Sequence, residues 1–174
     1  MAPSHDDAGA PAIDAQRWLD AFRRTAAAAT DAGAVEAAAA TVMSEVCAAA
    51  GWPVARLLAT AGGPVTPTGV WHLGDGDRFA SLTDAEASEK GRAVTRLAQR
   101  AAVLGRPVWT ADLSEVGAVG DAAWRVGLAG AAAFPVSDES AMVAVVEFFA
   151  ARPERPPAAV LEMAAAAVNQ LARV

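Results

Sequence analysis

Glu147 is a charged residue at the centre of an otherwise apolar segment, 143–149, which reads Val-Ala-Val-Val-Glu-Phe-Phe. Such a short apolar run predicts a strand that is buried on both faces. A carboxylate inside this strand costs free energy unless another group pairs with it. Glu147 is therefore either a structural residue, paired with an arginine or a backbone N–H or lying near water at the strand end, or a pocket residue that holds a polar group of a ligand. Alternation places it on the face of Val143, Val145 and Phe149.

Trp71 and His72 end another predicted strand and point to opposite faces, so one of them should face an interior cavity. His72 could ligate haem iron or accept a hydrogen bond from a ligand. A lone histidine is more often an ordinary residue at a strand end, and the other histidine, His5, lies near the N-terminus. Haem is therefore disfavoured, and no metal site is predicted.

Arg92 and Arg125 are the basic candidates for contact with an anionic ligand, and Trp109 and Trp124 are candidates for aromatic pocket walls. Solvated helix charges and core packing are the more common roles of these residue types. The candidate ligand-binding residues are Trp71, His72, Arg92, Trp109, Trp124, Arg125 and Glu147.

The sequence contains few features of a catalytic site. The serines and acidic residues of 137–140 lie in a predicted hairpin loop without a histidine to act as their base. The glycines of 62–63 are followed neither by a helix nor by a lysine, as a phosphate-binding loop requires. The acidic loop 74–77 lacks the ligand spacing of an EF-hand. Cys47 is the single cysteine, which excludes an intramolecular disulfide. No catalytic residue is predicted.

Composition favours one globular domain. The 174 residues are 54% hydrophobic and 20% charged, with a net charge of −6. Basic residues are scattered, which argues against nucleic-acid binding. No apolar run is long enough to cross a bilayer, and residues 1–12 lack the basic start and apolar core of a signal peptide. We expect a cytoplasmic protein with a flexible leader at 1–12 and a single domain at 13–174, of which 13–30 form an extra N-terminal helix and 31–174 the core.

Periodicity and turn residues predict an α+β fold. Asp14 can cap a first helix, and Gly51 can end a second one that follows an interruption at 30–33. Gly105 should end an amphipathic helix over 94–104, and Pro157 should begin the last helix. Residues 79–90 read as a short polar helix or loop, and 112–127 as a loop with a helical turn at 121–126. Strands are predicted at 54–60, 65–73, 107–110, 129–136 and 141–150.

The strand pairs imply a mostly antiparallel sheet with the terminal helices on one face and the middle helices and loops over the other, where a cavity can form. Trp18, Phe22 and the apolar stripe of 160–174 exceed what one sheet face obviously needs. This excess predicts a homodimer that pairs through the terminal helices.

Several short phrases together resemble the GAF domain of bacterial signalling proteins, most closely that of sensor histidine kinases. They are Gly-Arg-Pro-Val-Trp-Thr-Ala-Asp-Leu at 105–113, Phe-Pro-Val at 134–136 and Val-Val-Glu-Phe-Phe at 145–149. Trp-Pro-Val at 52–54, Trp-His-Leu at 71–73 and Asn-Gln-Leu at 169–171 agree as well. The resemblance extends over roughly 31–174. It implies a central antiparallel sheet of five or six strands, with a small-molecule pocket opposite the terminal helices.

Departures from the family pattern disfavour several of its known ligand classes. The Asn-Lys-Phe-Asp-Glu pattern of cyclic-nucleotide-binding members is missing. Members that carry linear tetrapyrroles attach them to a cysteine beside the pocket, whereas Cys47 lies in the second helix. Members that reduce free methionine sulfoxide need several cysteines. The resemblance therefore predicts a non-enzymatic sensory domain with an unidentified ligand, and it allows for a signalling partner protein. The alternative is a ligand-free dimerisation or protein-interaction module, which would follow if Trp71, Trp109 and Trp124 filled the cavity.

Overall fold

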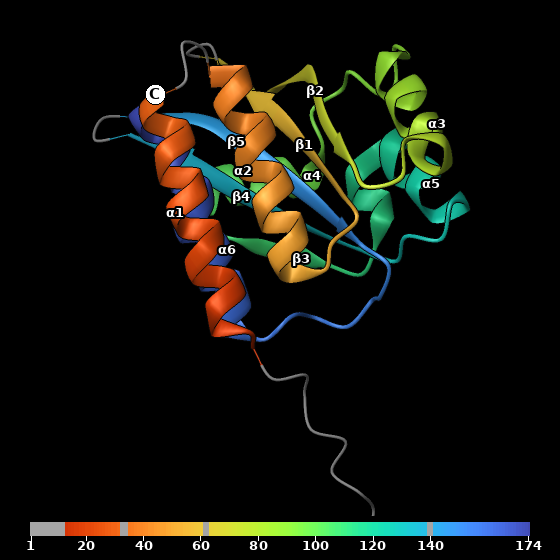
Figure 1. Cartoon of the computed structure of the whole chain (residues 1–174). Coiled ribbons are helices and arrows are strands. Elements are labelled where there is room, and N and C mark those ends of the chain that lie inside the picture. Colours follow the sequence, from red (N-terminus) through yellow and green to blue (C-terminus); the bar gives the residue numbers. More distant parts are fainter. Residues whose placement is uncertain (1–12, 32–34, 61–62, 139–140) are drawn as a thin grey trace, which may run out of the picture.

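A five-stranded antiparallel sheet separates two layers of helices in the computed structural model, which describes residues 13–31, 35–60, 63–138 and 141–174 (Figure 1). The predicted leader at 1–12 and the residues 32–34 of the helix interruption lie outside these ranges. The sheet order is β2-β1-β5-β4-β3. The strands are β1 (Val54–Ala59), β2 (Thr66–Leu73), β3 (Val108–Thr110), β4 (Gly130–Ser137) and β5 (Met142–Ala150). The prediction of an α+β fold with an antiparallel sheet of five or six strands is confirmed, and the sheet has five strands in the described residues.

The helices begin and end where their capping residues require. Asp14 accepts a hydrogen bond from Arg17 N at the start of α1, and Gly51 and Gly105 follow α2 and α4 with positive φ angles of 72° and 60°. Only glycine adopts that conformation without strain. The helices are α1 (Ala15–Asp31), α2 (Val35–Ala50), α3 (Gly76–Ala87), α4 (Arg96–Leu104), α5 (Gly117–Arg125) and α6 (Ala158–Val168), with 3₁₀ turns at Leu113–Val116 and Asn169–Arg173.

Each face of the sheet carries its own core. One cluster packs α1, α2 and α6 against one face, with Trp52, Phe134 and Phe148 in mutual ring contact. The other packs α3, α4 and α5 against the opposite face around Phe149. The predicted division between terminal and middle helices is therefore confirmed. No helix in the described ranges combines the length and apolarity that a membrane span requires.

Segment 112–127 contains more helix than its sequence predicts. The prediction is too low because α5 contains two glycines, and glycine has a low helix propensity. Gly120 is needed there for packing, since a Cβ atom at this position would lie 1.8 Å from the Leu113 carbonyl oxygen. The turn and the helix can therefore approach only over a residue without a side chain.

A bulge in β5 corrects one face assignment. Val136 of β4 pairs with Ala144, but Ser137 pairs with Met142, so Val143 is an extra residue in β5. Val143 consequently packs with the terminal-helix cluster, and Met142 packs with the other. Simple alternation holds for Val145, Glu147 and Phe149 and fails beyond the bulge.

The apolar stripes from which a dimer was predicted are covered within one chain. Trp18 is 3% exposed, Phe22 is half-buried, and the inward residues of α6 are buried. That argument for an exposed patch is therefore wrong. The dimer itself remains a prediction, to be argued from other surface residues.

Candidate functional site

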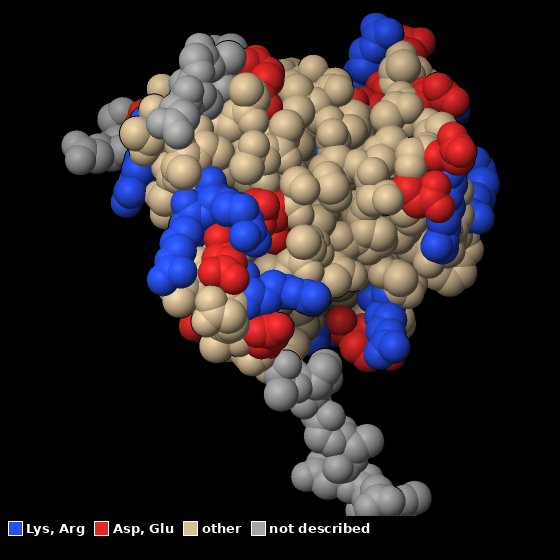
Figure 2. All heavy atoms as spheres, in the orientation of Figure 1, with Lys and Arg blue, Asp and Glu red and all other residues tan. Residues whose placement is uncertain are grey.

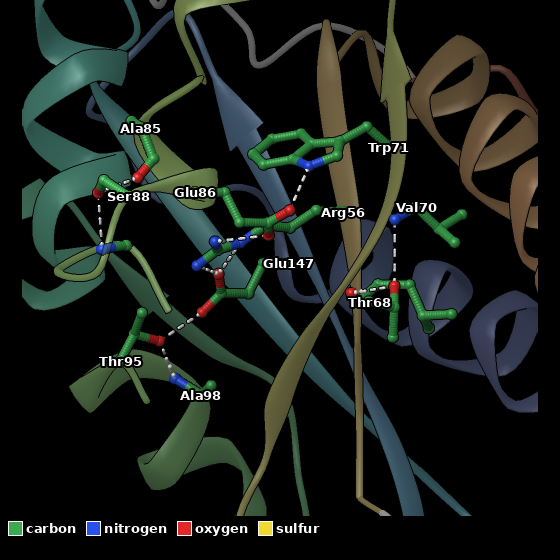
Figure 3. Close-up of polar contacts among 12 residues, drawn as sticks. Arg56, Thr68, Val70, Trp71, Ala85, Glu86, Ser88, Thr95, Ala98 and Glu147 are labelled. Atoms are coloured by element: carbon green, nitrogen blue, oxygen red, sulfur yellow. Dashed lines mark hydrogen bonds and ion pairs between the residues drawn. The ribbon is translucent and has the colours of Figure 1, made fainter. Parts of the chain in front are cut away.

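Glu147 pairs with an arginine in the neighbouring strand, in the interior of the domain (Figure 3). Arg56 Nε donates a hydrogen bond of 2.8 Å to Glu147 Oε2, and Arg56 Nη2 lies 2.6 Å from the same oxygen. Both side chains are 0% exposed. The two residues face each other in the β1–β5 register, so the sheet itself sets this geometry.

A second carboxylate, Glu86 of α3, reaches the same guanidinium. Arg56 Nη1 donates to Glu86 Oε1 at 3.1 Å, and the indole Nε1 of Trp71 donates to Glu86 Oε2 at 2.7 Å. Trp71 also stacks on Phe149. The Arg56 guanidinium lies over the Trp71 ring, with Arg56 Cζ 5.6 Å from the ring centroid. One guanidinium thus faces two buried carboxylates, and the ionised cluster carries one formal negative charge. We call Arg56, Trp71, Glu86, Thr95 and Glu147 the buried charge cluster.

Thr95 connects this cluster to a helix. Its hydroxyl donates to Glu147 Oε1 at 2.8 Å and accepts from Ala98 N, which caps the first turn of α4. A hydroxyl can do both because it is donor and acceptor at once. The hydrogen bonds therefore run without a break from Trp71 on β2 through α3, β1 and β5 to the start of α4 (Figure 3).

An irregularity in the edge strand β2 opens a groove beside this cluster. Arg56 pairs with Trp71, but Leu58 pairs with Pro67, so β2 bulges over 68–70. Gly69 has a φ of 76°, and Thr68 holds the bulge by donating to Leu57 O and accepting from Val70 N. Bulges in edge strands commonly shape binding sites.

The resulting groove, here called the Trp71 groove, has a volume of about 350 Å³ and lies between β2 and α3. Glu86 is the buried residue among those that line it, and Arg92 lies at its exposed rim with Nη2 bonded to Ala87 O. The lining residues are Pro67, Thr68, Gly69, Trp71, Thr83, Glu86, Ala87 and Arg92.

A second groove of about 490 Å³ lies between the Leu113–Val116 turn and α5. It contains Trp124, which is 68% exposed, and the exposed Arg125. Asp112 accepts from Ser114 N, and hydrogen bonds from the Ser114 side chain and backbone hold the pKa of that carboxyl below its ordinary value. None of its lining side chains belongs to the buried charge cluster.

The sequence candidates separate into three places. Trp71 and Arg92 meet in the Trp71 groove, and Glu147 lies beneath it in the buried charge cluster. Trp124 and Arg125 line the second groove. Trp109 packs with the terminal-helix cluster, on the sheet face opposite Glu147.

His72 also lies on that opposite face, since it pairs with Ala55, which belongs to the terminal-helix cluster. Burial lowers the pKa of His72 below 6.5. Of the two neighbours, Trp71 is therefore the one that faces the groove, and the position of His72 offers no ligand to a haem bound there. No group of three metal-ligating side chains occurs in the described ranges.

Sequence reasoning missed Arg56, Glu86 and Thr95. A signal for Arg56 was present, because it is a single charge in the apolar strand Val-Ala-Arg-Leu-Leu-Ala, as Glu147 is in its own strand. Glu86 shares the buried face of α3 with Phe79 and Leu82, at helical spacing. Two isolated opposite charges in apolar strands are a reason to expect an ion pair.

The single cysteine is remote from both grooves. Cys47 is buried in α2, within the terminal-helix cluster, and burial raises the pKa of its thiol. A thiol held in its neutral form is a poor nucleophile. Nothing in this position supports thiol chemistry on a ligand in the Trp71 groove.

The fold has several counterparts among solved structures. The free methionine-R-sulfoxide reductase of Neisseria meningitidis superposes with a TM-score of 0.66 at 10% identity, over 97% of this chain and 94% of that one. The GAF domain of a phosphoenolpyruvate-protein phosphotransferase from Coxiella burnetii gives 0.65 at 14% identity, over 92% and 94%. The GAF domain of a putative sensor histidine kinase from Pseudomonas syringae pv. tomato gives 0.59 at 14%, over 90% and 84%.

These likenesses concern the fold, because every identity lies far below the level at which function is shared. No family model and no curated protein matches the sequence.

Proposed function

Because the chain has the fold of the GAF domains, we propose that it is a cytoplasmic sensory domain that binds a small molecule in the Trp71 groove. The observation that carries this proposal is the connection between the groove and the buried charge cluster. Glu86 lines the groove and also bonds to Arg56, so a ligand that contacts Glu86 acts on the cluster directly. Buried charges are costly, and a network of them at the floor of a groove is typical of functional sites.

The signal would travel from the groove through the sheet to the terminal helices. Arg56 and Glu147 face the groove side of β1 and β5, while their neighbours Leu57 and Phe148 pack with α2 and α6 on the other face. A change in the Arg56–Glu147 pairing would alter the spacing of these two strands. That change would in turn shift the packing of the helices on the opposite face.

The partner surface we propose is the outer face of α1 and α2, used in a homodimer. On this side of the molecule the charged side chains gather over α1 and its boundary with α2, and a broad area without charged side chains lies beside them, over α2 and toward β1 and β2 (Figure 2). Exposed apolar residues of this part of the chain include Leu19 and Val35. Light scattering at micromolar concentration should give twice the chain mass, and a monomeric mass would exclude this interface.

We propose that the domain performs no catalysis. The Neisseria reductase has the same fold, but this chain has one cysteine. That cysteine is buried on the sheet face opposite the Trp71 groove. A dedicated interaction module without ligand is the second candidate function. It is favoured by the filled interior between the sheet and helices α3 and α4. Phe79, Leu82 and Phe149 are buried there, on the same side of the sheet as the buried charge cluster.

Native mass spectrometry and an absorption spectrum of the purified protein distinguish the two functions. A sensory domain should carry the additional mass of a small metabolite or acquire one from a metabolite extract, without visible absorption from haem or a tetrapyrrole. A bare chain mass under both conditions would support the interaction module instead.

A further inference from the structure

The Trp71 groove presents opposite charges at two depths. Its floor includes Glu86, whose side chain is 7% exposed, and its rim includes the exposed Arg92. Both residues line the same groove, from the last turn of α3 and the segment that follows it. A ligand that enters between β2 and α3 therefore passes a guanidinium and ends at a carboxylate.

The floor has unused capacity to accept hydrogen bonds. Glu86 Oε1 accepts from Arg56 and Oε2 accepts from Trp71 Nε1, which leaves one further acceptor site on each oxygen. The buried charge cluster also carries one formal negative charge in excess, from two carboxylates and one guanidinium. A positively charged donor at Glu86 would balance that charge in an environment of low dielectric constant.

The rim has unused capacity to donate. Arg92 Nη2 bonds to Ala87 O, and among the described residues Arg92 forms no ion pair. Its guanidinium has five N–H donors in a planar fork that matches a carboxylate. The bond to Ala87 O holds the side chain beside the groove and leaves donors for an anion.

We propose that the Trp71 groove binds a small zwitterion, with an ammonium group at Glu86, a carboxylate at Arg92 and its apolar part against the Trp71 indole; free α-amino acids are the simplest members of this class. This inference rests on the proposed function and names its ligand class. A purely cationic ligand would meet the like charge of Arg92, and a purely anionic one would meet Glu86. The volume of about 350 Å³ lies at the small end of ligand sites, as suits a metabolite with few heavy atoms.

Calorimetric titration with three related probes tests the charge requirement. The first step titrates each standard amino acid to find one that binds. Its decarboxylated amine and its deaminated acid then serve as probes that each lack one charge. The proposal predicts binding of the amino acid and a loss of about tenfold or more in affinity for each single-charge probe, since each loses a charge-assisted hydrogen bond.

Variants then assign the contacts. Arg92→Gln should weaken amino-acid binding by about tenfold or more and should not weaken binding of the amine, because the amine has no carboxylate for Arg92 and loses only a like charge. Arg106→Gln removes an exposed arginine that lines neither groove and should change nothing. Glu86→Gln should weaken the amine as well, provided that its circular dichroism spectrum shows a folded chain.

The outcomes separate this inference from the proposed function. If no amino acid binds, or if an amine or acid alone binds as tightly as the amino acid, the zwitterion inference is wrong. A retained mass in the native spectrum would then still support a sensory domain with another ligand. Equal effects of Arg92→Gln and Arg106→Gln would likewise overturn the assignment to this groove.

Discussion

Replacing Arg56 with methionine should destabilise the domain far more than the same replacement at Arg24. The two arginines form ion pairs of nearly equal length, 2.8 Å from Arg56 Nε to Glu147 and 2.7 Å from Arg24 Nε to Glu45. They differ in burial, since the Arg56 pair is 0% exposed on both sides and the Arg24 pair is 55% and 18% exposed. The comparison therefore sets a buried arginine with two carboxylate partners against a partly exposed arginine with one.

Arg56→Met leaves Glu86 and Glu147 as two buried carboxylates without their common cation. Removing one partner of a buried pair costs about 3–5 kcal/mol. Arg24→Met removes a surface pair, which contributes about 0–1 kcal/mol. Against a total stability of about 5–15 kcal/mol, only the first loss approaches the threshold of unfolding.

Urea unfolding followed by circular dichroism measures both losses as shifts of the transition midpoint. The double variant Arg56→Met/Glu147→Leu should be more stable than the sum of its single losses predicts, because a buried pair replaced by apolar side chains leaves fewer charges unpaired. If Arg56→Met and Arg24→Met destabilised the domain equally, to within about 0.5 kcal/mol, the reasoning that places a buried charge cluster under the groove would be refuted.

Three further predictions concern other parts of the chain. Because burial lowers the pKa of His72, the unfolded chain takes up its proton first as the pH falls below 6.5, so stability from this residue is full above 6.5 and declines below it; His72→Gln should lose less stability between pH 7.5 and 5.5 than the wild type, and an equal loss would contradict this. Gly69→Ala should cost about 1–2 kcal/mol through its φ of 76° alone, since a Cβ atom there contacts nothing within 4 Å, and Gly69→Asn should cost less; equal costs would argue against backbone strain. The purified protein should not consume free methionine-R-sulfoxide with thioredoxin or dithiothreitol as reductant, and Cys47 should react with a thiol reagent only after denaturation; turnover that Cys47→Ala abolishes would overturn the non-enzymatic proposal.

The parts of the fold that local sequence determines could be predicted. Gly51 and Gly105 end their helices because the left-handed conformation at those positions favours glycine, and the hairpin of β1 and β2 follows from two predicted strands separated by turn residues. The division of terminal and middle helices between the two faces follows from the order of these elements. The helix ends and the hairpin depend on neighbours within a few residues, and the order of the elements is read along the chain, so a sequence displays both directly.

The site depended on contacts between distant residues and was only partly predicted. Glu147 was recognised as costly, but its partner Arg56 lies 91 residues earlier, and Glu86 lies 30 residues after Arg56. No local pattern brings these positions together; the register of β1 against β5 does. Trp109 is a candidate for an aromatic pocket wall by its residue type, yet its position in the three-residue strand β3 turns it to the sheet face opposite Glu147.

The pairing of Glu147 with Arg56 supports the structural interpretation of this residue. The proposed contact with a ligand is made by Glu86 instead. Glu147 is wholly buried and bonds to Arg56 and Thr95, whereas Glu86 takes the position at the groove. The sequence therefore indicates this cluster through Glu147, which is connected through Arg56 to Glu86, the carboxylate that lines the groove.

The most direct test of the central claim, that the Trp71 groove binds a small molecule, compares native mass spectra of the wild type and two variants of α3. Ala87→Trp fills the groove, because Ala87 lines it, and Ala80→Trp adds the same side chain to an exposed position of α3 outside it. After incubation with a metabolite extract, the wild type and Ala80→Trp should carry the same additional small mass and Ala87→Trp should not. The claim would be contradicted by three bare chains, or by an additional mass that Ala87→Trp retains.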